Sequence, residues 1–160
     1  MLLNQETKDK IYSEYNSFKE NLYAGKSLEE RKELDQFFTP PELTIAMIEK
    51  FDCDSLEDKR ILDPCCGSGN LLAACLIAGA TPRKIFGNDF DATMVKVCKK
   101  RLNSICRELN KEPVPTHNIH EGDAMRRDSL TEFNKAYEEI YAKDKDLKAK
   151  NDSMEKVELF

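Results

Sequence analysis

The feature that most constrains the fold is the run ILDPCCGSGNLL, which occupies residues 61–72. A short apolar segment ends there in an acid, and a Gly-Ser-Gly turn then leads into a second apolar segment. This order predicts a buried strand over 60–63, a tight turn, and a helix over 70–78. Such a unit leaves free backbone N–H groups at the start of the helix, at the edge where open α/β sheets bind ligands.

The alternation of strand and helix continues along the chain. The pattern predicts a second strand over 84–89, a long helix over 92–109 and a third strand over 116–120. The inward face of the long helix is expected to carry Met94, Val95, Val97, Cys98, Leu102, Ile105, Cys106 and Leu109. Strands joined by helices pair in parallel, and right-handed crossovers place the helices on the sheet faces. The expected fold class is therefore α/β, built as a three-layer sandwich.

An N-terminal helical arm is expected over residues 1–36. Polar residues dominate this region, and a first amphipathic helix is predicted from the helical spacing of Ile11, Tyr15, Phe18 and Leu22. Gly25 is expected to end that helix. Ser27 and Glu30 have the spacing of a capping box, which predicts the start of a second, shorter helix.

The α/β core is expected over residues 37–125, and it opens with a helix over 41–51. The Pro-Pro pair at 40–41 breaks the chain before this helix, and Thr39 is placed to cap it. A charged, helical C-terminal segment is expected over 126–160. Its last residues, MEKVELF, are interpreted as the approach to a fourth strand.

Composition narrows the class of protein. None of the 160 residues lies in an apolar stretch long enough to cross a membrane, and the start, MLLNQETKDK, lacks the features of a signal peptide. We therefore expect a cytoplasmic protein without a membrane partner. The formal net charge of −5 argues against binding nucleic acid by phosphate neutralisation alone.

The six cysteines are scattered through apolar contexts without CxxC spacing, which predicts reduced thiols rather than disulfides or a zinc site. Cys65 and Cys66 are adjacent and poorly placed to bridge each other, and we expect Cys66 to pack inward. His117 and His120 point to opposite faces of a predicted strand, so no metal site is expected.

The residues around the glycine turn indicate which ligand it takes. A dinucleotide site requires a third glycine where the chain has Leu72, and no Gly-Lys-Ser or Gly-Lys-Thr of a Walker loop occurs. Asp63, at the end of the first strand, repels phosphates but can orient an amino group. Asp89, 20 positions after Gly69, is placed to accept hydrogen bonds from both ribose hydroxyls, and Phe90 offers a face to adenine. Adenosine without phosphate, beside an acid suited to an amino group, predicts S-adenosylmethionine as the cofactor.

Two motifs carry a family resemblance. The run DPCCGSG resembles the glycine motif of amino-methylating DNA methyltransferases, and QFFTPPE, at residues 36–42, resembles their N-terminal cofactor motif. The sequence is similar, over about residues 35–125, to the N6-adenine class associated with restriction-modification systems. The resemblance implies a partial Rossmann-like core of the S-adenosylmethionine-dependent methyltransferases and a function connected with DNA methylation.

The resemblance also implies a set of site residues, carried over motif by motif. The methionine end of the cofactor would contact Gln36, Phe38, Thr39 and Pro40, and the loop around it would consist of Asp63, Cys65, Gly67 and Gly69. The adenosine end would be held by Asp89 at the ribose, by Phe90 on the adenine ring, and by Asp123 of HEGDAM at the adenine amino group, with Ala124 beside it.

The catalytic motif of the family is expected after the fourth strand, where an Asn or Asp, two prolines and an aromatic residue receive the flipped base. The only Pro-Pro pair of this chain is at 40–41, and no proline follows Asp123. No catalytic residue is therefore assigned, and the chain is expected to bind S-adenosylmethionine without methylating DNA alone. DNA binding is expected only with a completing partner or a further C-terminal part.

Two alternatives stay open at this point. The chain is one half of a split DNA adenine methyltransferase that a partner chain completes, or it is a non-enzymatic interaction or decoy protein that keeps the fold. A sheet that stops at its fourth strand leaves an open edge, so a homo-oligomer or a partner chain is expected as well.

Overall fold

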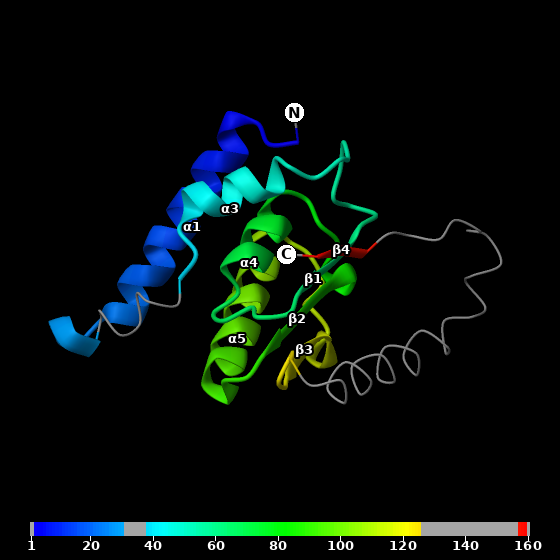
Figure 1. Cartoon of the computed structure of the whole chain (residues 1–160). Coiled ribbons are helices and arrows are strands. Elements are labelled where there is room, and N and C mark those ends of the chain that lie inside the picture. The colour runs from blue at the N-terminus through cyan, green and yellow to red at the C-terminus, as the bar shows by residue number, and fades with distance from the viewer. Residues whose placement is uncertain (1, 31–37, 126–156, 160) are drawn as a thin grey trace.

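The computed structural model describes residues 2–30, 38–125 and 157–159 of the chain (Figure 1). Its elements are α1 (Gln5–Tyr23), α3 (Pro41–Ile48), β1 (Arg60–Asp63), α4 (Asn70–Ile77), β2 (Ile85–Asp89), α5 (Ala92–Glu108), β3 (Ile119–Glu121) and β4 (Val157–Leu159). Two short 3-10 turns, η1 (Pro82–Lys84) and η2 (Thr116–Asn118), lead into β2 and β3. Strands and helices alternate from β1 to β3, which confirms the α/β class.

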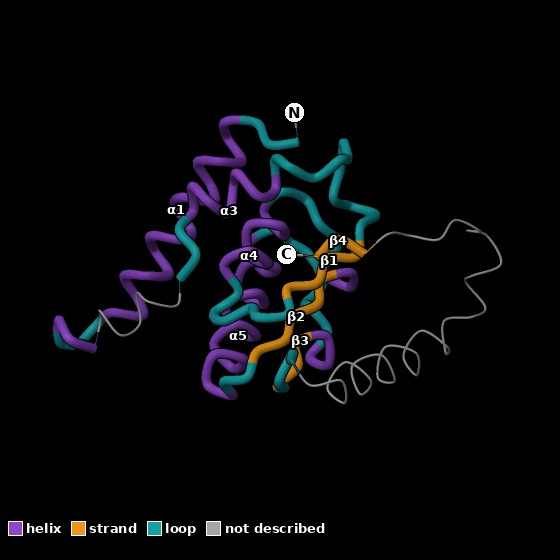
Figure 2. Tube along the Cα trace, in the orientation of Figure 1, coloured by secondary structure: helices purple, strands orange, loops and turns teal. Residues whose placement is uncertain are grey.

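The four strands form one parallel sheet in the order β3-β2-β1-β4 (Figure 2). Ile61 of β1 pairs with Ile85 of β2, and on the other side of β1, Leu62 pairs with Leu159 of β4. The segment MEKVELF, interpreted above as the approach to a fourth strand, contains β4 itself. The chain order reverses at β1, and open α/β sheets bind ligands at the carboxyl edge beside such a reversal.

Helices α4 and α5 pack on one face of the sheet, and α1 lies outside them beside α3 (Figure 1). The steps from β1 to β2 and from β2 to β3 run in the same direction across the sheet. Right-handed crossovers therefore bring both helices to the same face. This arrangement is compatible with part of a Rossmann-like fold. The predicted three-layer sandwich also requires a layer of helices on the opposite face, and this third layer stays a prediction.

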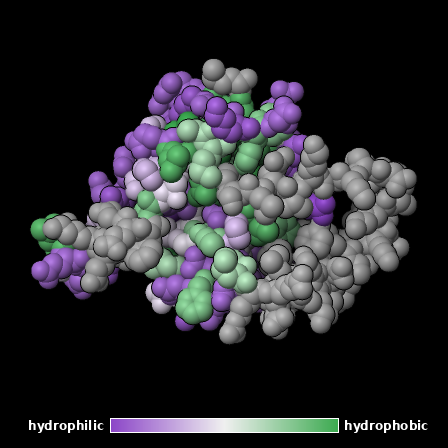
Figure 3. Space-filling view, viewed as in Figure 1, coloured by the Kyte–Doolittle hydropathy of each residue, from purple (hydrophilic) through white to green (hydrophobic). Residues whose placement is uncertain are grey.

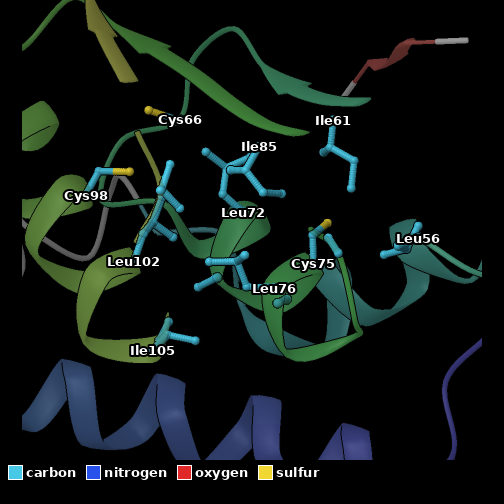
Figure 4. Close-up of a cluster of buried hydrophobic side chains, with 14 of the residues drawn as sticks. Leu56, Ile61, Cys66, Leu72, Cys75, Leu76, Ile85, Cys98, Leu102 and Ile105 are labelled. Atoms are coloured by element: carbon cyan, nitrogen blue, oxygen red, sulfur yellow. The ribbon is translucent and has the colours of Figure 1, made fainter. Parts of the chain in front are cut away.

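The hydrophobic core lies between the sheet and these helices. In Figure 4, Leu72 and Leu76 of α4 lie between Ile85 of the sheet and the ribbon of α1. Every residue of α4 up to Leu76 is buried, because the helix has the sheet on one side and α1 and α3 on the other. A helix in such a position has no polar face, which explains the apolar run LLAACLI.

Helix α5 is amphipathic, and its buried side confirms most of the predicted stripe. Five of the expected residues are buried, namely Val95, Cys98, Leu102, Ile105 and Cys106. Met94, Val97 and Leu109 are half-buried. The member of this side that the pattern did not predict is Arg101, which is only 5% exposed.

The helix starts follow the predicted capping signals with one exception. Ser27 Oγ accepts from the Glu30 N–H at 3.3 Å, and the Glu30 carboxylate accepts from the Ser27 N–H at 2.7 Å, which confirms the capping box. Thr39, in contrast, does not cap α3. Because Pro41 occupies the first helical position, the capping position falls on Pro40, which has no side-chain cap.

Two other boundaries differ from the prediction. Helix α3 ends at Ile48 rather than near residue 51, and the third strand begins only at Ile119, after the 3-10 turn. The side-chain amide of Asn118 explains this turn, because it donates to the carbonyls of Arg83 and Ile85 at 3.1 and 2.9 Å. These bonds hold the turn against the start of β2.

The visible surface is hydrophilic along much of α1, at the left and top of Figure 3, and more hydrophobic nearer its centre. Among the described residues, the large hydrophobic ones that are exposed are Leu28, Leu43, Phe90 and Met125. Phe90 and Met125 follow the ends of β2 and β3, at the carboxyl edge of the sheet. None of the helices within the described ranges combines the length and the apolar character needed to cross a membrane.

Candidate functional site

Three acids from three strand ends gather at the carboxyl edge of the sheet. Asp63 ends β1, Asp89 ends β2, and Asp123 lies two positions after β3. Burial raises the pKa of the Cys65 thiol, and the negative charges of Asp63, Asp89 and Asp123 raise it further. All three carboxylates therefore act on one point of the glycine loop, and the edge is strongly negative.

Gly69 makes the connection from the loop to α4. It is the N-cap residue of that helix and has a φ of 83°, in the left-handed region. A Cβ at this position would lie 2.7 Å from Cys98 Sγ on α5, so a side chain is excluded by packing as well as by conformation. The loop is closed by a hydrogen bond of 2.7 Å from the Gly69 N–H to the Cys66 carbonyl.

Asp89 binds the glycine loop directly. Its Oδ2 accepts from the Gly67 N–H at 2.7 Å, and its Oδ1 accepts from the Asp91 N–H at 2.9 Å. Each carboxylate oxygen has a further lone pair, so Asp89 can accept hydrogen bonds from a ligand while it keeps both backbone bonds. Phe90 follows with 79% of its surface exposed, which leaves its ring available for contact. Asp91 caps α5 by accepting from the Thr93 N–H at 2.7 Å.

Asp63 is the buried acid of the site, with 5% of its surface exposed. Burial raises its pKa to about 6, the charge of Asp89 adds to this rise, and the hydrogen bond from the Cys65 N–H opposes it. That bond is 3.1 Å long. A cation that binds beside a buried carboxyl group with a raised pKa favours its ionised form. This is the behaviour expected of a functional acid.

Asn88 on β2 is a structural residue of the site that sequence reasoning missed. Its side-chain amide donates to the carbonyls of Pro64 and Gly122, at 3.1 and 2.9 Å, and its own backbone carbonyl accepts from the Cys66 N–H at 2.8 Å. The single buried side chain thus connects the loops that follow β1 and β3. The signal was a polar residue before Asp89 in the otherwise apolar strand IFGND.

The segment that precedes α3 reaches the start of α4. The Thr39 carbonyl accepts from the side-chain amide of Asn70 at 3.1 Å, and the Phe38 ring contacts the Phe18 ring edge-on at 6.2 Å between centroids. The exposed Pro40 is the N-cap residue of α3, and its carbonyl accepts from the Thr44 N–H at 3.1 Å. Gln36, the remaining predicted residue of this group, lies outside the described residues.

The residues after β3 form the other border of the site. Asp123 is half-buried and accepts from the Met125 N–H at 2.9 Å, and Ala124 between them is also half-buried. Cys65 is exposed, whereas Cys66 is buried as predicted. In the ranges that the structure describes, no cluster of three or more His, Cys, Asp or Glu side chains is arranged to hold a metal ion.

Most of the predicted site residues therefore fall into two groups, one joined by hydrogen bonds and one that borders it. Asp63, Cys65, Gly67, Gly69 and Asp89 share one hydrogen-bonded loop, and Thr39 joins it through Asn70. Phe90, Asp123 and Ala124 border the loop at neighbouring strand ends. The site combines carboxylate acceptors, a negative potential and an exposed ring, and it has no basic side chain among the predicted residues.

Comparisons with known proteins agree with this arrangement. The chain matches the family described as N-6 DNA Methylase over residues 15–153. It is 33% identical over 72 residues to the Type II methyltransferase M.VspI of Vibrio sp. (strain 343). That match covers 44% of this chain and 17% of the relative, so the chain spans less than a fifth of that protein. No solved structure matches the chain significantly.

The family match takes in most of the chain, including the glycine loop and the three acids. The motifs DPCCGSG and QFFTPPE had indicated the same family from the residues alone. This chain belongs to the N-6 DNA Methylase family, the N6-adenine DNA methyltransferases.

Proposed function

We propose that this chain is the S-adenosylmethionine-binding part of an N6-adenine DNA methyltransferase, with a partial Rossmann-like methyltransferase core. The observation that supports it most is the bond between Asp89 and Gly67, which joins the acid of β2 to the glycine loop beside the buried Asp63. A cationic cofactor without phosphate suits an edge with three carboxylates, because a phosphate would be repelled there.

The proposed contacts are those that the family resemblance implies, and the chemistry of Asp63, Asp89 and Phe90 supports them. Asp89 accepts from the ribose hydroxyls with its remaining lone pairs, and Phe90 packs on the adenine ring. Asp63 pairs with the methionine amino group, directly or through water. The adenine amino group donates to Asp123, beside Ala124. The methionine end contacts Gln36, Phe38, Thr39 and Pro40 and the loop formed by Cys65, Gly67 and Gly69.

Methyl transfer to DNA needs residues that these 160 do not contain, because no Asn-Pro-Pro or Asp-Pro-Pro occurs among them. We therefore propose cofactor binding as the activity of this chain and DNA methylation as the activity of a larger assembly. Two alternatives differ from this proposal. In a split enzyme a partner chain supplies the catalytic residues, and a decoy protein keeps the fold without binding the cofactor.

Calorimetric titration of the chain with S-adenosylmethionine tests the proposed site. Binding is expected, and Asp89→Ala should weaken it at least tenfold, since two hydrogen bonds to the ribose and the brace on Gly67 are lost. Glu121→Gln is the matched control, because it removes the same charge from the end of the neighbouring strand. Absence of binding at millimolar cofactor, or equal binding by Asp89→Ala, would refute the site and favour the decoy protein.

A methylation assay tests whether a partner chain completes this chain as a split enzyme. The purified chain is incubated with DNA and labelled cofactor, with and without an extract from its source. Transfer only with extract supports a split enzyme, whereas transfer by the chain alone would show that the 160 residues suffice and would contradict the proposal.

A further inference from the structure

Arg101 is a charged residue in the apolar side of α5. It is 5% exposed, between Cys98 and Leu102, which are both fully buried. Burial of a charge costs free energy unless the charge is paired and hydrogen-bonded. The partners of Arg101 therefore determine what this residue does in the molecule.

One side of Arg101 is held by α1. Its Nε donates to Glu14 Oε1 at 2.8 Å and its Nη2 donates to Glu14 Oε2 at 2.6 Å, a bidentate pair. The guanidinium carbon lies 3.8 Å from the centre of the Phe18 ring, one helical turn further along α1. Two residues of α1 thus fix both the plane and the position of the guanidinium group.

The other side of Arg101 reaches the glycine loop. Its Nη1 donates to the side-chain oxygen of Asn70 and, at 3.5 Å, to the Ser68 carbonyl. Because the Asn70 oxygen accepts from Arg101, the amide nitrogen of Asn70 faces the other way, where it donates to the Thr39 carbonyl at 3.1 Å. Arg101 therefore sets the orientation of the amide that joins the loop to the segment before α3.

From these contacts we propose that Arg101 is a positioning residue, which transmits the placement of α1 to the methionine end of the cofactor site through Asn70. This assignment rests on the proposed function, since Ser68 and Thr39 border the methionine end proposed above. Phe18 contacts Phe38 as well as Arg101, so α1 braces two adjacent residues of that segment. The adenosine end, with Asp89 and Phe90, has no hydrogen bond to this network among the described residues.

The network is open to solvent on the side of α1. A groove of about 520 Å³ runs between α1 and α5 and reaches Glu14, Phe18 and Arg101. The Glu14 side chain keeps 17% of its surface exposed, whereas that of Arg101 keeps 3%. A change at Glu14 can therefore be hydrated rather than leave a void, which makes it the mildest way to loosen the network.

The test compares two ligands that differ only at the methionine end. Dissociation constants of S-adenosylmethionine and of 5′-methylthioadenosine, which lacks the amino-acid part, are measured by calorimetry for the full chain and its variants. Glu14→Gln, Arg101→Lys and Asn70→Ala should each weaken S-adenosylmethionine about tenfold, because charge-assisted or amide bonds that position the segment are lost. The affinity for 5′-methylthioadenosine should change less than about twofold.

Asn70→Ala keeps the Arg101–Glu14 pair and removes the bonds of the Asn70 side chain to Arg101 and to Thr39, so it reports on the network even where Arg101→Lys does not fold. Lys10→Gln is the matched control, because it breaks the exposed pair of Lys10 with Glu6 on the same helix. Equal weakening of both ligands, or no change in either, would overturn the assignment and leave cofactor binding by the wild-type chain intact. A wild-type chain that binds neither ligand would instead contradict the proposed function.

Discussion

Asp63 lies directly before the glycine loop, and its burial raises its pKa to about 6, well above the ordinary value of 3.8. In the cofactor-free protein this acid contributes stability that is present below about pH 3.8 and lost as the pH rises through about 6. A bound cation reverses the preference, because it stabilises the ionised carboxylate. Cofactor binding and folding therefore respond to the titration of one residue in opposite directions.

Affinity for S-adenosylmethionine is accordingly expected to fall as the pH falls through about 6, the pKa of Asp63. Well below that value the decline approaches about tenfold per pH unit, since binding must then release the Asp63 proton. Calorimetry between pH 5 and pH 7.5, in buffers with different enthalpies of ionisation, measures both the affinity and the proton release. Asp63→Asn should bind weakly with little pH dependence, and a flat profile for the folded wild-type chain would contradict the role of Asp63.

Alanine substitutions at Gly69 and Gly25 distinguish the energetic cost of backbone strain from the cost of a packing collision. Gly69 and Gly25 both have positive φ values, of 83° and 76°, but only Gly69 has a close neighbour, Cys98 Sγ at 2.7 Å from an added Cβ. Gly25→Ala should cost about 1–2 kcal/mol through strain alone. Gly69→Ala should lower the free energy of unfolding by more, because its Cβ also collides with Cys98. Adding Cys98→Ala to that variant should remove the cost of the collision but leave the cost of the backbone strain. Urea denaturation of the four proteins checks this, and equal costs at both glycines would refute the packing contribution.

At the scale of elements, close contact between α4 and the sheet depends on a glycine in β2. Leu72 of α4 stands where a dinucleotide-binding loop would have its third glycine, and its Cδ1 lies 2.8 Å from the position of a Cβ at Gly87. Cys66 Sγ and Ile119 Cδ1 lie at 3.1 and 3.2 Å from the same point. The close approach of α4 to the sheet therefore depends on a glycine in the strand rather than on a glycine in the helix.

Gly87→Ala is expected to lower the free energy of unfolding by about 1–3 kcal/mol, because the added methyl group overpacks three buried side chains. Combining it with Leu72→Val should cost less than the sum of the two single changes, since the smaller side chain frees part of the space. Chemical denaturation of the wild-type chain and of the three variants of this cycle measures the coupling. Strict additivity would show that Leu72 is not the residue in conflict with the new methyl group.

At the scale of the whole molecule, α1 is packed as part of the core. Its Ile11 is 3% exposed, the preceding Leu3 is fully buried, and both belong to the cluster that contains Ile61 and Ile85 of the sheet. The sequence-based division into an arm over 1–36 and a core over 37–125 stays a prediction. The packing favours one cooperative folding unit that includes α1.

Ile11→Ala should therefore destabilise the entire protein by about 2–5 kcal/mol. Amide hydrogen exchange of β1 and β2 should accelerate together with that of α1, because all three open in the same transition. Lys10→Gln, next to Ile11 but exposed, should change stability by less than about 0.5 kcal/mol. Faster exchange confined to α1 would show that the arm unfolds independently of the sheet.

Much of this protein could be predicted because the relevant forces act between near neighbours in the sequence. Apolar runs and glycines predicted β1 with both of its ends and α4 and α5 to within one residue. Ser27 marked a helix start through its bond to Glu30, three positions away. The acid that ends β1, the acid that ends β2 and the glycine loop were predicted as a site from their spacing along the chain and from the family resemblance.

Only the tertiary structure decided how distant residues meet. Arg101 is bound by a residue 87 positions away, Asn70 donates to a carbonyl 31 positions away, and Asn88 joins loops 24 and 34 positions from itself. A local pattern assigns a buried arginine or asparagine to the surface, because the cost of burying it is offset by partners that exist only after folding. The sequence by itself therefore determined the elements and the chemistry of the strand ends, while long-range hydrogen bonding decided which polar residues hold the site in shape.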